Sequence, residues 1–327
     1  MPDAQDMIRA TRGDLVESTH RGHAVVMDAG GIAMAWGDPD AVIYPRSSCK
    51  MLQALPLIEA GVDLPSERMA LACASHQGAA LHVEGVRHWL ADMGLGEDDL
   101  MCGPEPSRDT DLRHAMIRAH EAPGQVHNNC SGKHAGFLAL TRHLGAGPAY
   151  VDPDHPVQKA VRAAFEEVTG EDSPGFGFDG CSAPNFATTT TGLARAMQRF
   201  ASAGQGGGGR DGAMAALRDA MIAHPMLVAG EGRACTELMA ACTTPAAIKT
   251  GAEGVFVAIL PERGMGVALK IADGATRASE AAIAAILVHL GALDPEHPAA
   301  RRRLGVPIVN RAGLEVGRIE AMAGFPA

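Results

Sequence analysis

The run Arg46-Ser47-Ser48-Cys49-Lys50 places a serine three residues before a lysine, and the run Lys249-Thr250-Gly251 follows much later in the chain. Residues three apart lie on one face of a helix, so the Lys50 amine can reach the Ser47 hydroxyl. A serine hydroxyl is a weak nucleophile until a base takes its proton, and a lysine serves as that base once its pKa is lowered. The two runs together predict a serine hydrolase that acts on an amide.

Ser-x-x-Lys followed by a late Lys-Thr-Gly is typical of penicillin-recognising serine enzymes. The chain has only five lysines, so a lysine in each motif is informative. The alternative is an ordinary helix start, with Ser47 or Ser48 as the N-terminal cap and Lys50 in solvent. The later motif stands in the expected order and before a predicted strand, which favours the catalytic interpretation.

Composition limits the possible partners and surroundings of the chain. Its 327 residues are 46% hydrophobic, enough for a sizeable core, and the net charge of −10 argues against binding nucleic acid. No apolar stretch is long enough to span a membrane, so we expect no membrane partner. The N-terminus shows no signal peptide, and seven cysteines are an odd number. Together these features predict a cytoplasmic protein in a reducing compartment.

Hydrophobic periodicity predicts strands at both ends of the chain and helices between them. The first strands are expected at Asp14–Thr19, His23–Asp28 and Ile32–Trp36. Helices are expected at Ser47–Ala60, Leu81–Met93, Asp111–Ala119, Val157–Val168 and Leu193–Ala201. The last elements expected are strands Gly254–Leu260 and Gly266–Ala272, joined by a hairpin, and helix Thr276–Leu290.

This order of elements predicts an α+β layout within the α/β class, in which one antiparallel sheet is built from both termini and helices form a separate lobe. That is the arrangement expected of the serine β-lactamase-like fold. The glycine-rich stretch Gly204–Gly209 predicts a surface connection. Because the hydrophobic pattern does not change across it, we expect a single domain over residues 1–327.

Other polar segments concentrate residues that carry chemistry. Ser75 stands between the two motifs, where a second motif serine could lie, although a loop serine bonded to nearby backbone is the alternative. Cys130 and Lys133 are three residues apart, and Cys181 lies in another polar segment. Two thiolates with one or two nitrogen ligands can hold zinc, whereas a buried cysteine is more often a small hydrophobic residue.

Four blocks of sequence resemble the asparaginase II family, the rhizobial-type class 3 L-asparaginases. They are Arg46–Lys50, Ala74–His76, Asn128–Gly136 and Asp179–Pro184. The likeness extends from about Leu15 to Arg277 and is most specific in Asn128-Asn129-Cys130-Ser131-Gly132-Lys133-His134. The resemblance implies a serine β-lactamase-like fold, a homodimer, and hydrolysis of L-asparagine to L-aspartate and ammonia.

The resemblance also assigns roles to residues of this chain. It implies two Ser–Lys pairs, Ser47 with Lys50 and Ser75 with a late lysine, for which Lys249 fits better than Lys270 because it lies in the Lys-Thr-Gly run. It implies a Zn²⁺ site with water at Cys130, Lys133 and Cys181, and substrate-binding positions at Arg46, His134 and Asp179.

Two other functions remain possible on sequence grounds. A β-lactamase, a D-Ala peptidase or another amidase would use the same serine and lysine motifs. A non-catalytic module that binds a small molecule could keep the fold, but intact Ser47, Lys50, Ser75 and Lys249 argue against it. Neither the nucleophilic serine nor the preference for asparagine over glutamine follows from the sequence.

Overall fold

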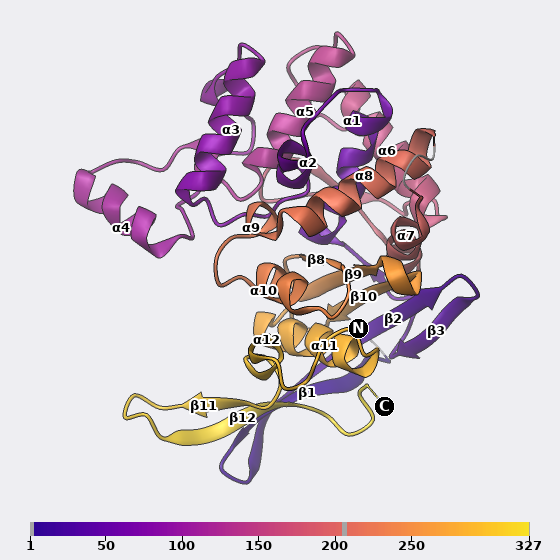
Figure 1. Ribbon diagram of the computed structural model, residues 1–327, viewed down its shortest axis with the longest axis vertical. Coiled ribbons are helices and arrows are strands. Elements are labelled where there is room, and N and C mark those ends of the chain that lie inside the picture. Colours follow the sequence, from indigo (N-terminus) through magenta and orange to yellow (C-terminus); the bar gives the residue numbers. More distant parts are fainter. Residues whose placement is uncertain (1–2, 205–207, 327) are drawn as a thin grey trace. The chain divides into compact units, whose positions relative to one another are not determined.

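The structure is a computed structural model that describes residues 3–204 and 208–326 (Figure 1). Part of the predicted glycine-rich connection, residues 205–207, lies outside the described residues. The chain forms two compact units. The sheet unit comprises Met1–Ser48, Thr188–Ser202 and Glu237–Ala327, and the helical unit comprises Cys49–Ala187 and Ala203–Thr236. The single domain expected over residues 1–327 stays a prediction.

An antiparallel sheet forms the centre of the sheet unit, in the order β11-β12-β1-β2-β10-β9-β8, with β3 paired to β2. Its strands are β1 (Gln5–Arg12), β2 (Leu15–Asp28), β3 (Gly31–Trp36), β8 (Ala247–Thr250), β9 (Val255–Leu260), β10 (Met265–Ile271), β11 (Val306–Val309) and β12 (Glu315–Ala321). The N-terminal strands β1 and β2 lie between C-terminal strands on both sides, which confirms the predicted sheet built from both termini.

One long strand replaces two predicted short ones. β2 runs unbroken from Leu15 to Asp28 and so joins the two strands predicted at Asp14–Thr19 and His23–Asp28, apart from Asp14, which lies in the preceding turn. Between them lies Gly22, where an added Cβ would meet the Lys270 carbonyl oxygen at 2.3 Å. The glycine therefore marks a close approach of β10 to β2 and not a turn. Strands β1, β11 and β12 were not predicted from the sequence.

Two helices pack on this sheet within the same unit. α7 (Thr190–Ser202) packs against β2, β9 and β10, while α11 (Thr276–His289) packs against β1, β9 and β10. At Gly266 in β10, a Cβ would lie only 2.1 Å from the Gln198 amide nitrogen, so glycine lets α7 lie directly on the strand. β9 is buried at every position, as its continuous apolar sequence predicts for a covered strand.

The helical unit corresponds to the predicted helical lobe. Its main helices are α1 (Lys50–Glu59), α2 (Ser66–Ala72), α3 (Ala80–Asp92), α4 (Thr110–Ala119), α5 (Ser131–His143), α6 (Pro156–Thr169), α8 (Gly209–Ala223) and α9 (Pro225–Val228). α1 and α2 both pack against α5 and α8 (Figure 1). The helices predicted at Leu81–Met93, Asp111–Ala119 and Val157–Val168 are confirmed with small shifts at their ends.

Helix α5 was not predicted from the sequence, although it begins inside the polar block Asn128–Gly136. Every residue from Ser131 to Thr141 is buried. Because no side of this segment faces water, its sequence lacks the alternation of polar and apolar faces by which a surface helix is recognised. Within residues 3–204 and 208–326, no helix combines the length and apolar character needed to cross a membrane.

Candidate functional site

The first serine motif forms a tight turn that leads into α1. Residues Arg46–Cys49 make the 3₁₀ turn η1, so the predicted helix from Ser47 to Ala60 begins with a narrower first turn. Ser48 closes this turn, because its hydroxyl donates to the Pro45 carbonyl at 2.7 Å and its amide donates to the same oxygen at 3.2 Å. Ser48 therefore has a structural role, while Ser47 is partly exposed and stays the candidate nucleophile.

The Lys-Thr-Gly run lies against that turn within the sheet unit. At Gly251, directly after β8, an added Cβ would lie 2.5 Å from the Pro45 carbonyl oxygen and 3.2 Å from the Ser48 nitrogen. The glycine thus allows two motifs far apart in sequence to meet backbone to backbone. Lys249 is 1% exposed, and its amine donates to the Thr250 carbonyl at 3.0 Å.

Replacing Gly251 with alanine is expected to destabilise the protein by about 1–3 kcal/mol, because the new methyl group overlaps backbone atoms that cannot move independently. Turnover should fall as well, since the displaced Pro45 and Ser48 belong to the turn that carries Ser47. Denaturant unfolding and steady-state kinetics measure the two effects. Gly147→Ala is the control, since no atom lies within 4 Å of the added Cβ there; equal stability of the two variants would contradict the close approach.

Arg46 and Lys270 both approach the loop that follows β8. Arg46 adopts a left-handed backbone conformation with φ of 53°, and its guanidinium lies 4.0 Å from the Glu253 carboxylate. Glu253 is also left-handed, with φ of 57°. The Lys270 amine donates to the Glu253 carbonyl, and burial lowers the pKa of Lys270. Lys270 thus supports this loop, whereas Lys249 is the more deeply buried amine.

In the helical unit, Lys50 is fully buried at the start of α1. Its amine donates to the Ala74 carbonyl at 2.5 Å and to the Cys130 sulfur at 3.2 Å. The alternative of a solvent-exposed lysine at an ordinary helix start is therefore excluded.

Ser75, which follows Ala74 in the sequence, is 5% exposed, and its hydroxyl makes no hydrogen bond within the part of the chain that the structure describes. A buried hydroxyl without a partner is uncommon and suits a group that meets a bound ligand.

His76 ties the Ser75 segment to the start of α5. Its amide donates to the Asn129 carbonyl at 3.2 Å, and its Nε2 lies 3.0 Å from the Ser131 hydroxyl. Because the Gly78 amide donates to Nδ1 at 3.1 Å, the proton of the neutral ring belongs on Nε2, where it is donated to Ser131. Ser75 is thereby held beside the block that contains the predicted metal ligands.

The three predicted metal ligands lie together in the helical unit. The Lys133 amine donates to the Cys181 sulfur at 3.1 Å, and Cys130 forms a hydrogen bond with Cys181. Cys181 reaches this position from a turn in which the Asp179 amide donates to the Ala183 carbonyl at 2.9 Å. Lys133 is 2% exposed, and both sulfurs are buried.

Charge is shared unevenly in this cluster. The pKa of the Cys181 thiol lies well below its ordinary value, because Cys130 donates to its sulfur and the Lys133 ammonium lies beside it, although burial opposes this. The same hydrogen bond, together with burial, raises the pKa of Cys130. Burial alone would lower the pKa of Lys133, but the two sulfurs and Asp179 outweigh it and raise that pKa. Of the two thiols, Cys181 is thus the one whose surroundings favour the thiolate.

These residues provide a donor set that suits zinc. Thiolates and a neutral nitrogen are ligands that Zn²⁺ prefers, and binding would displace the protons of Cys130 and Lys133. Among the described residues, no three His, Cys, Asp or Glu side chains gather in a way that could hold a metal ion. A metal at this cluster would therefore depend on Lys133 for its third protein ligand.

His134 presents a second unpaired group. The Met101 amide donates to the Tyr150 hydroxyl at 2.7 Å, which leaves the phenol hydrogen for His134 Nδ1 at 2.9 Å. This pattern assigns the imidazole proton to Nε2, which is buried and has no hydrogen-bond partner in the described residues. Burial, and then the charge of Lys133, lower the pKa of His134 well below its ordinary value. The ring is thus a neutral donor.

Asp179 borders a pocket of about 530 Å³ that lies wholly in the helical unit. The pocket is lined by Met101, Ala149, Val151, Asp152, Pro153, Phe178, Asp179 and Ser182. Asp179 is partly exposed and is one of the residues that line this pocket. The space is large enough for a small polar molecule such as an amino acid.

The predicted site residues divide between the two units. The helical unit brings together Lys50, Ser75, Cys130, Lys133, His134, Asp179 and Cys181, and the sheet unit contains Arg46, Ser47 and Lys249. The pairing of Ser47 with Lys50 and of Ser75 with Lys249 stays a prediction. Glu105 and Tyr150, which contact Asn129 and His134, were not predicted from the sequence. Neither lies in a motif, and no local pattern could have identified them.

Solved structures with a similar arrangement include two β-lactamases. One, from Mycobacterium bovis, is 13% identical with a TM-score of 0.40, and the match covers 83% of this chain and 95% of that one. A class C β-lactamase from Rhodobacter sphaeroides is 14% identical with a TM-score of 0.42, and the match covers 83% and 95%. The protein Mglu in its native form is 15% identical with a TM-score of 0.48, and the match covers 85% and 66%.

A search of curated protein sequences found no match. Residues 8–321, nearly the whole chain, match the sequence model of the L-asparaginase II family. The match includes every segment described above as part of the candidate site. The chain therefore belongs to the L-asparaginase II family of amidohydrolases.

Proposed function

We propose that the protein is an L-asparaginase, which hydrolyses L-asparagine to L-aspartate and ammonia. The observation that carries this proposal is the position of the buried Lys50 amine. It contacts the carbonyl of Ala74, the residue before Ser75 in sequence, and also the Cys130 sulfur, while the Ser75 hydroxyl has no hydrogen-bond partner among the described residues. A buried amine that can act as a base and a serine hydroxyl that can act as a nucleophile are the groups that amide hydrolysis by a serine uses.

Ser47 or Ser75 attacks the side-chain amide carbon of asparagine. A neutral lysine amine takes the hydroxyl proton, and the same proton later leaves with the nitrogen as the carbon–nitrogen bond breaks and ammonia departs. Water then attacks the resulting ester, which releases aspartate and restores the serine. Backbone N–H groups near the serine stabilise the negative oxygen that forms in each step.

Arg46, His134 and Asp179 are proposed to bind the substrate. Asparagine carries an α-carboxylate and an α-ammonium group at neutral pH. Asp179 lines the pocket of the helical unit, and a carboxylate suits the ammonium group. The unpaired Nε2 proton of His134 and the guanidinium of Arg46 are donors that suit oxygen atoms of the substrate.

Cys130, Lys133 and Cys181 are proposed to hold Zn²⁺. When bound, the ion would supply positive charge that orients the substrate and polarises its oxygen. The protein's own contribution is to keep the two sulfurs and the amine together in a buried place. Since a serine already serves as the nucleophile, this proposal does not require the metal to activate water.

Elemental analysis of the purified protein is expected to find about one zinc per chain, as a site with three protein ligands and a fourth position for water implies. Cys181→Ser should lose most of the metal, because each ligand is needed. Cys242→Ser, which changes a cysteine outside the helical unit, should retain it. Stripping the metal should raise KM more than it lowers kcat; fully active protein without zinc would count against the site.

The function is tested by measuring ammonia release from L-asparagine and L-glutamine, and hydrolysis of a chromogenic β-lactam, side by side. Turnover of asparagine with little turnover of the β-lactam is the expected result. Preferential turnover of the β-lactam would instead favour a β-lactamase or D-Ala peptidase. If none of the three compounds reacts, the alternative of a non-catalytic binding module is favoured.

The homodimer and the cytoplasmic location stay predictions. The homodimer is implied by the family resemblance, and light scattering of the purified protein would measure it. The location rests on the odd number of cysteines, and fractionation of cells that express the protein would measure it.

A further inference from the structure

Asn129 lies between two parts of the candidate site in the helical unit. Its carbonyl accepts the His76 amide at 3.2 Å, next to Ser75. Its side-chain Oδ1 lies 3.1 Å from the sulfur of Cys130, one of the predicted metal ligands. The single thiol hydrogen of Cys130 thus has two acceptors, Asn129 Oδ1 and the Cys181 sulfur. The conformation of Asn129 therefore affects both the serine segment and the sulfur cluster.

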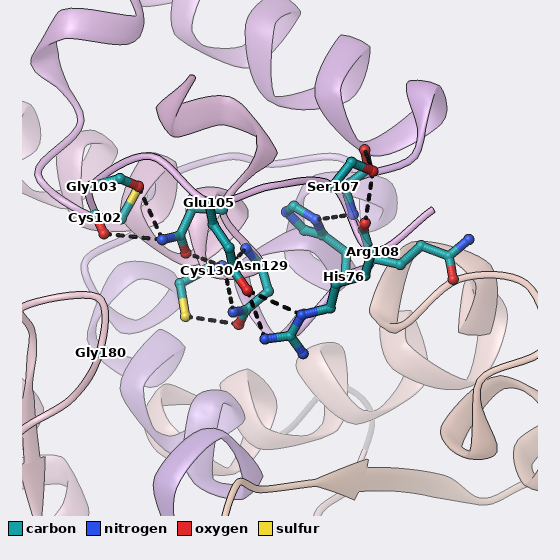
Figure 2. Close-up of polar contacts among 12 residues, drawn as sticks. His76, Cys102, Gly103, Glu105, Ser107, Arg108, Asn129, Cys130 and Gly180 are labelled. Atoms are coloured by element: carbon teal, nitrogen blue, oxygen red, sulfur yellow. Dashed lines mark hydrogen bonds and ion pairs between the residues drawn. The ribbon is translucent and has the colours of Figure 1, made fainter. Parts of the chain in front are cut away.

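One carboxylate outside all the motifs holds Asn129 in this conformation. Glu105 Oε2 accepts the Asn129 side-chain Nδ2 at 2.7 Å and the Asn129 backbone amide at 3.1 Å (Figure 2). A carboxylate only accepts hydrogen bonds, so it must face the NH₂ group of the asparagine. The amide is planar, and its oxygen consequently turns towards Cys130. The charge of Glu105 thus selects one of the two possible orientations of the Asn129 side chain.

Glu105 is itself held in place by an arginine. Arg108 donates to Glu105 Oε1 through Nε at 3.1 Å and through Nη2 at 2.7 Å (Figure 2). The second oxygen of the carboxylate thereby stays free for Asn129. Burial by itself would raise the pKa of Glu105, but the bonds from Asn129 and Arg108 outweigh it and lower that pKa. Glu105 is therefore ionised at neutral pH.

We propose that Glu105 is a positioning residue of the active site, which orients Asn129 and through it sets the positions of the Cys130 sulfur and of the Ser75–His76 segment. Its effect on turnover rests on the proposed asparaginase activity, whereas its effect on Cys130 does not. In its hydrogen bonds within the described residues, the Glu105 carboxylate pairs with Arg108 and Asn129 and with no serine or sulfur. Its influence passes entirely through the two hydrogen bonds to Asn129.

The test measures the reactivity of individual cysteines in the full chain as purified. N-ethylmaleimide labelling, followed by peptide mass spectrometry, gives the rate at Cys130 relative to the buried Cys73 and Cys235 in the same sample. In Glu105→Ala the labelling rate of Cys130 relative to these two cysteines should change by about tenfold. The reason is that Asn129 loses both of its hydrogen bonds to the partly buried carboxylate and is no longer held in one orientation. In Glu105→Gln, which keeps one acceptor oxygen, the change should be smaller.

Glu166→Gln is the matched control. Glu166 is also a partly buried glutamate that pairs with an arginine, Arg162, at 2.9 Å and accepts a backbone amide, that of Ser173, at 3.0 Å. It lies at the end of α6 and contacts none of the candidate site residues in these bonds. In Glu166→Gln, the relative labelling rate of Cys130 should match that of the unsubstituted protein, since this variant loses the same kinds of hydrogen bond at the end of α6.

Kinetics provide the second readout. For Glu105→Ala, kcat/KM for asparagine should fall by about tenfold to a hundredfold, consistent with the loss of two hydrogen bonds to a charged group. Glu105→Gln should recover part of this loss. If Glu105→Ala does not fold, the comparison of Glu105→Gln with Glu166→Gln decides the question.

An unchanged labelling rate of Cys130 in folded Glu105 variants would overturn the proposal. So would an equal rise in the labelling rates of Cys130, Cys73 and Cys235, which would indicate that the whole unit has become less tightly packed. If the original protein fails to hydrolyse asparagine, the proposed function fails, but the labelling result still decides whether Glu105 positions Asn129. A change confined to Cys130, absent in Glu166→Gln, supports the proposal.

Discussion

Replacing Ser47 with alanine is expected to lower amide hydrolysis by a factor on the order of a thousand while the fold is retained, as is common when one member of a nucleophile–base pair is removed. Lys50→Ala should cause a similar loss, because Lys50 is the base predicted for Ser47. The measurement is kcat with L-asparagine, with circular dichroism to confirm the fold. Ser47 is partly exposed in η1, so its loss removes no packed core group.

Ser48→Ala is the matched control for the nucleophile. Ser48 is the adjacent serine, but its hydroxyl donates to the Pro45 carbonyl and closes the turn. Its loss should cost about 1 kcal/mol of stability through that hydrogen bond, and activity should fall far less than in Ser47→Ala. If Ser47→Ala and Lys50→Ala both keep near-normal rates, the Ser-x-x-Lys interpretation is wrong. A loss found only in Ser75→Ala would instead assign the attack to Ser75.

Lys249→Met is expected to lower kcat by a factor on the order of a hundred or more, because it removes the amine that the late motif provides. The substitution conserves the length of the side chain in a position that is 1% exposed, so the fold should tolerate it. Rates measured with the asparagine and glutamine substrates show whether the loss is general.

Lys270→Met distinguishes the two late lysines. Lys270 is partly exposed in β10, and its amine supports the Glu253 carbonyl. We expect it to change activity by about tenfold or less, since it loses one hydrogen bond to a loop. A larger loss in Lys270→Met than in Lys249→Met would reverse the assignment and make the Lys-Thr-Gly run a structural feature.

Much of the fold could be predicted because its signals are local. Helix α6 begins where the His155 side chain accepts the Val157 amide and Pro156 fits the first turn, and it ends at Gly170 in a left-handed conformation. Such start and stop signals lie within a few residues of the elements that they define. The hairpin between β9 and β10 and the apolar helix α11 were likewise predicted from signals within their own segments. The strand order confirms the predicted sheet built from both termini.

The motif residues were also recognisable in the sequence, since Ser47 and Lys50 are three residues apart and this spacing predicts that both lie on one face of a helical turn. Family membership, which the match over residues 8–321 shows, agrees with the blocks that suggested it. The assigned roles of the serines, lysines and cysteines remain proposals that the variants above address.

Only the tertiary structure decided which polar groups meet. Lys50 reaches Cys130 across 80 residues of sequence, and Glu105 reaches Asn129 across 24. Helix α5, which carries Lys133 and His134, is buried over most of its length and so has no polar face to show its period. Local sequence patterns indicate which residues of a segment face solvent and which face the core. They do not report which buried groups become neighbours, because that depends on how separate elements pack together.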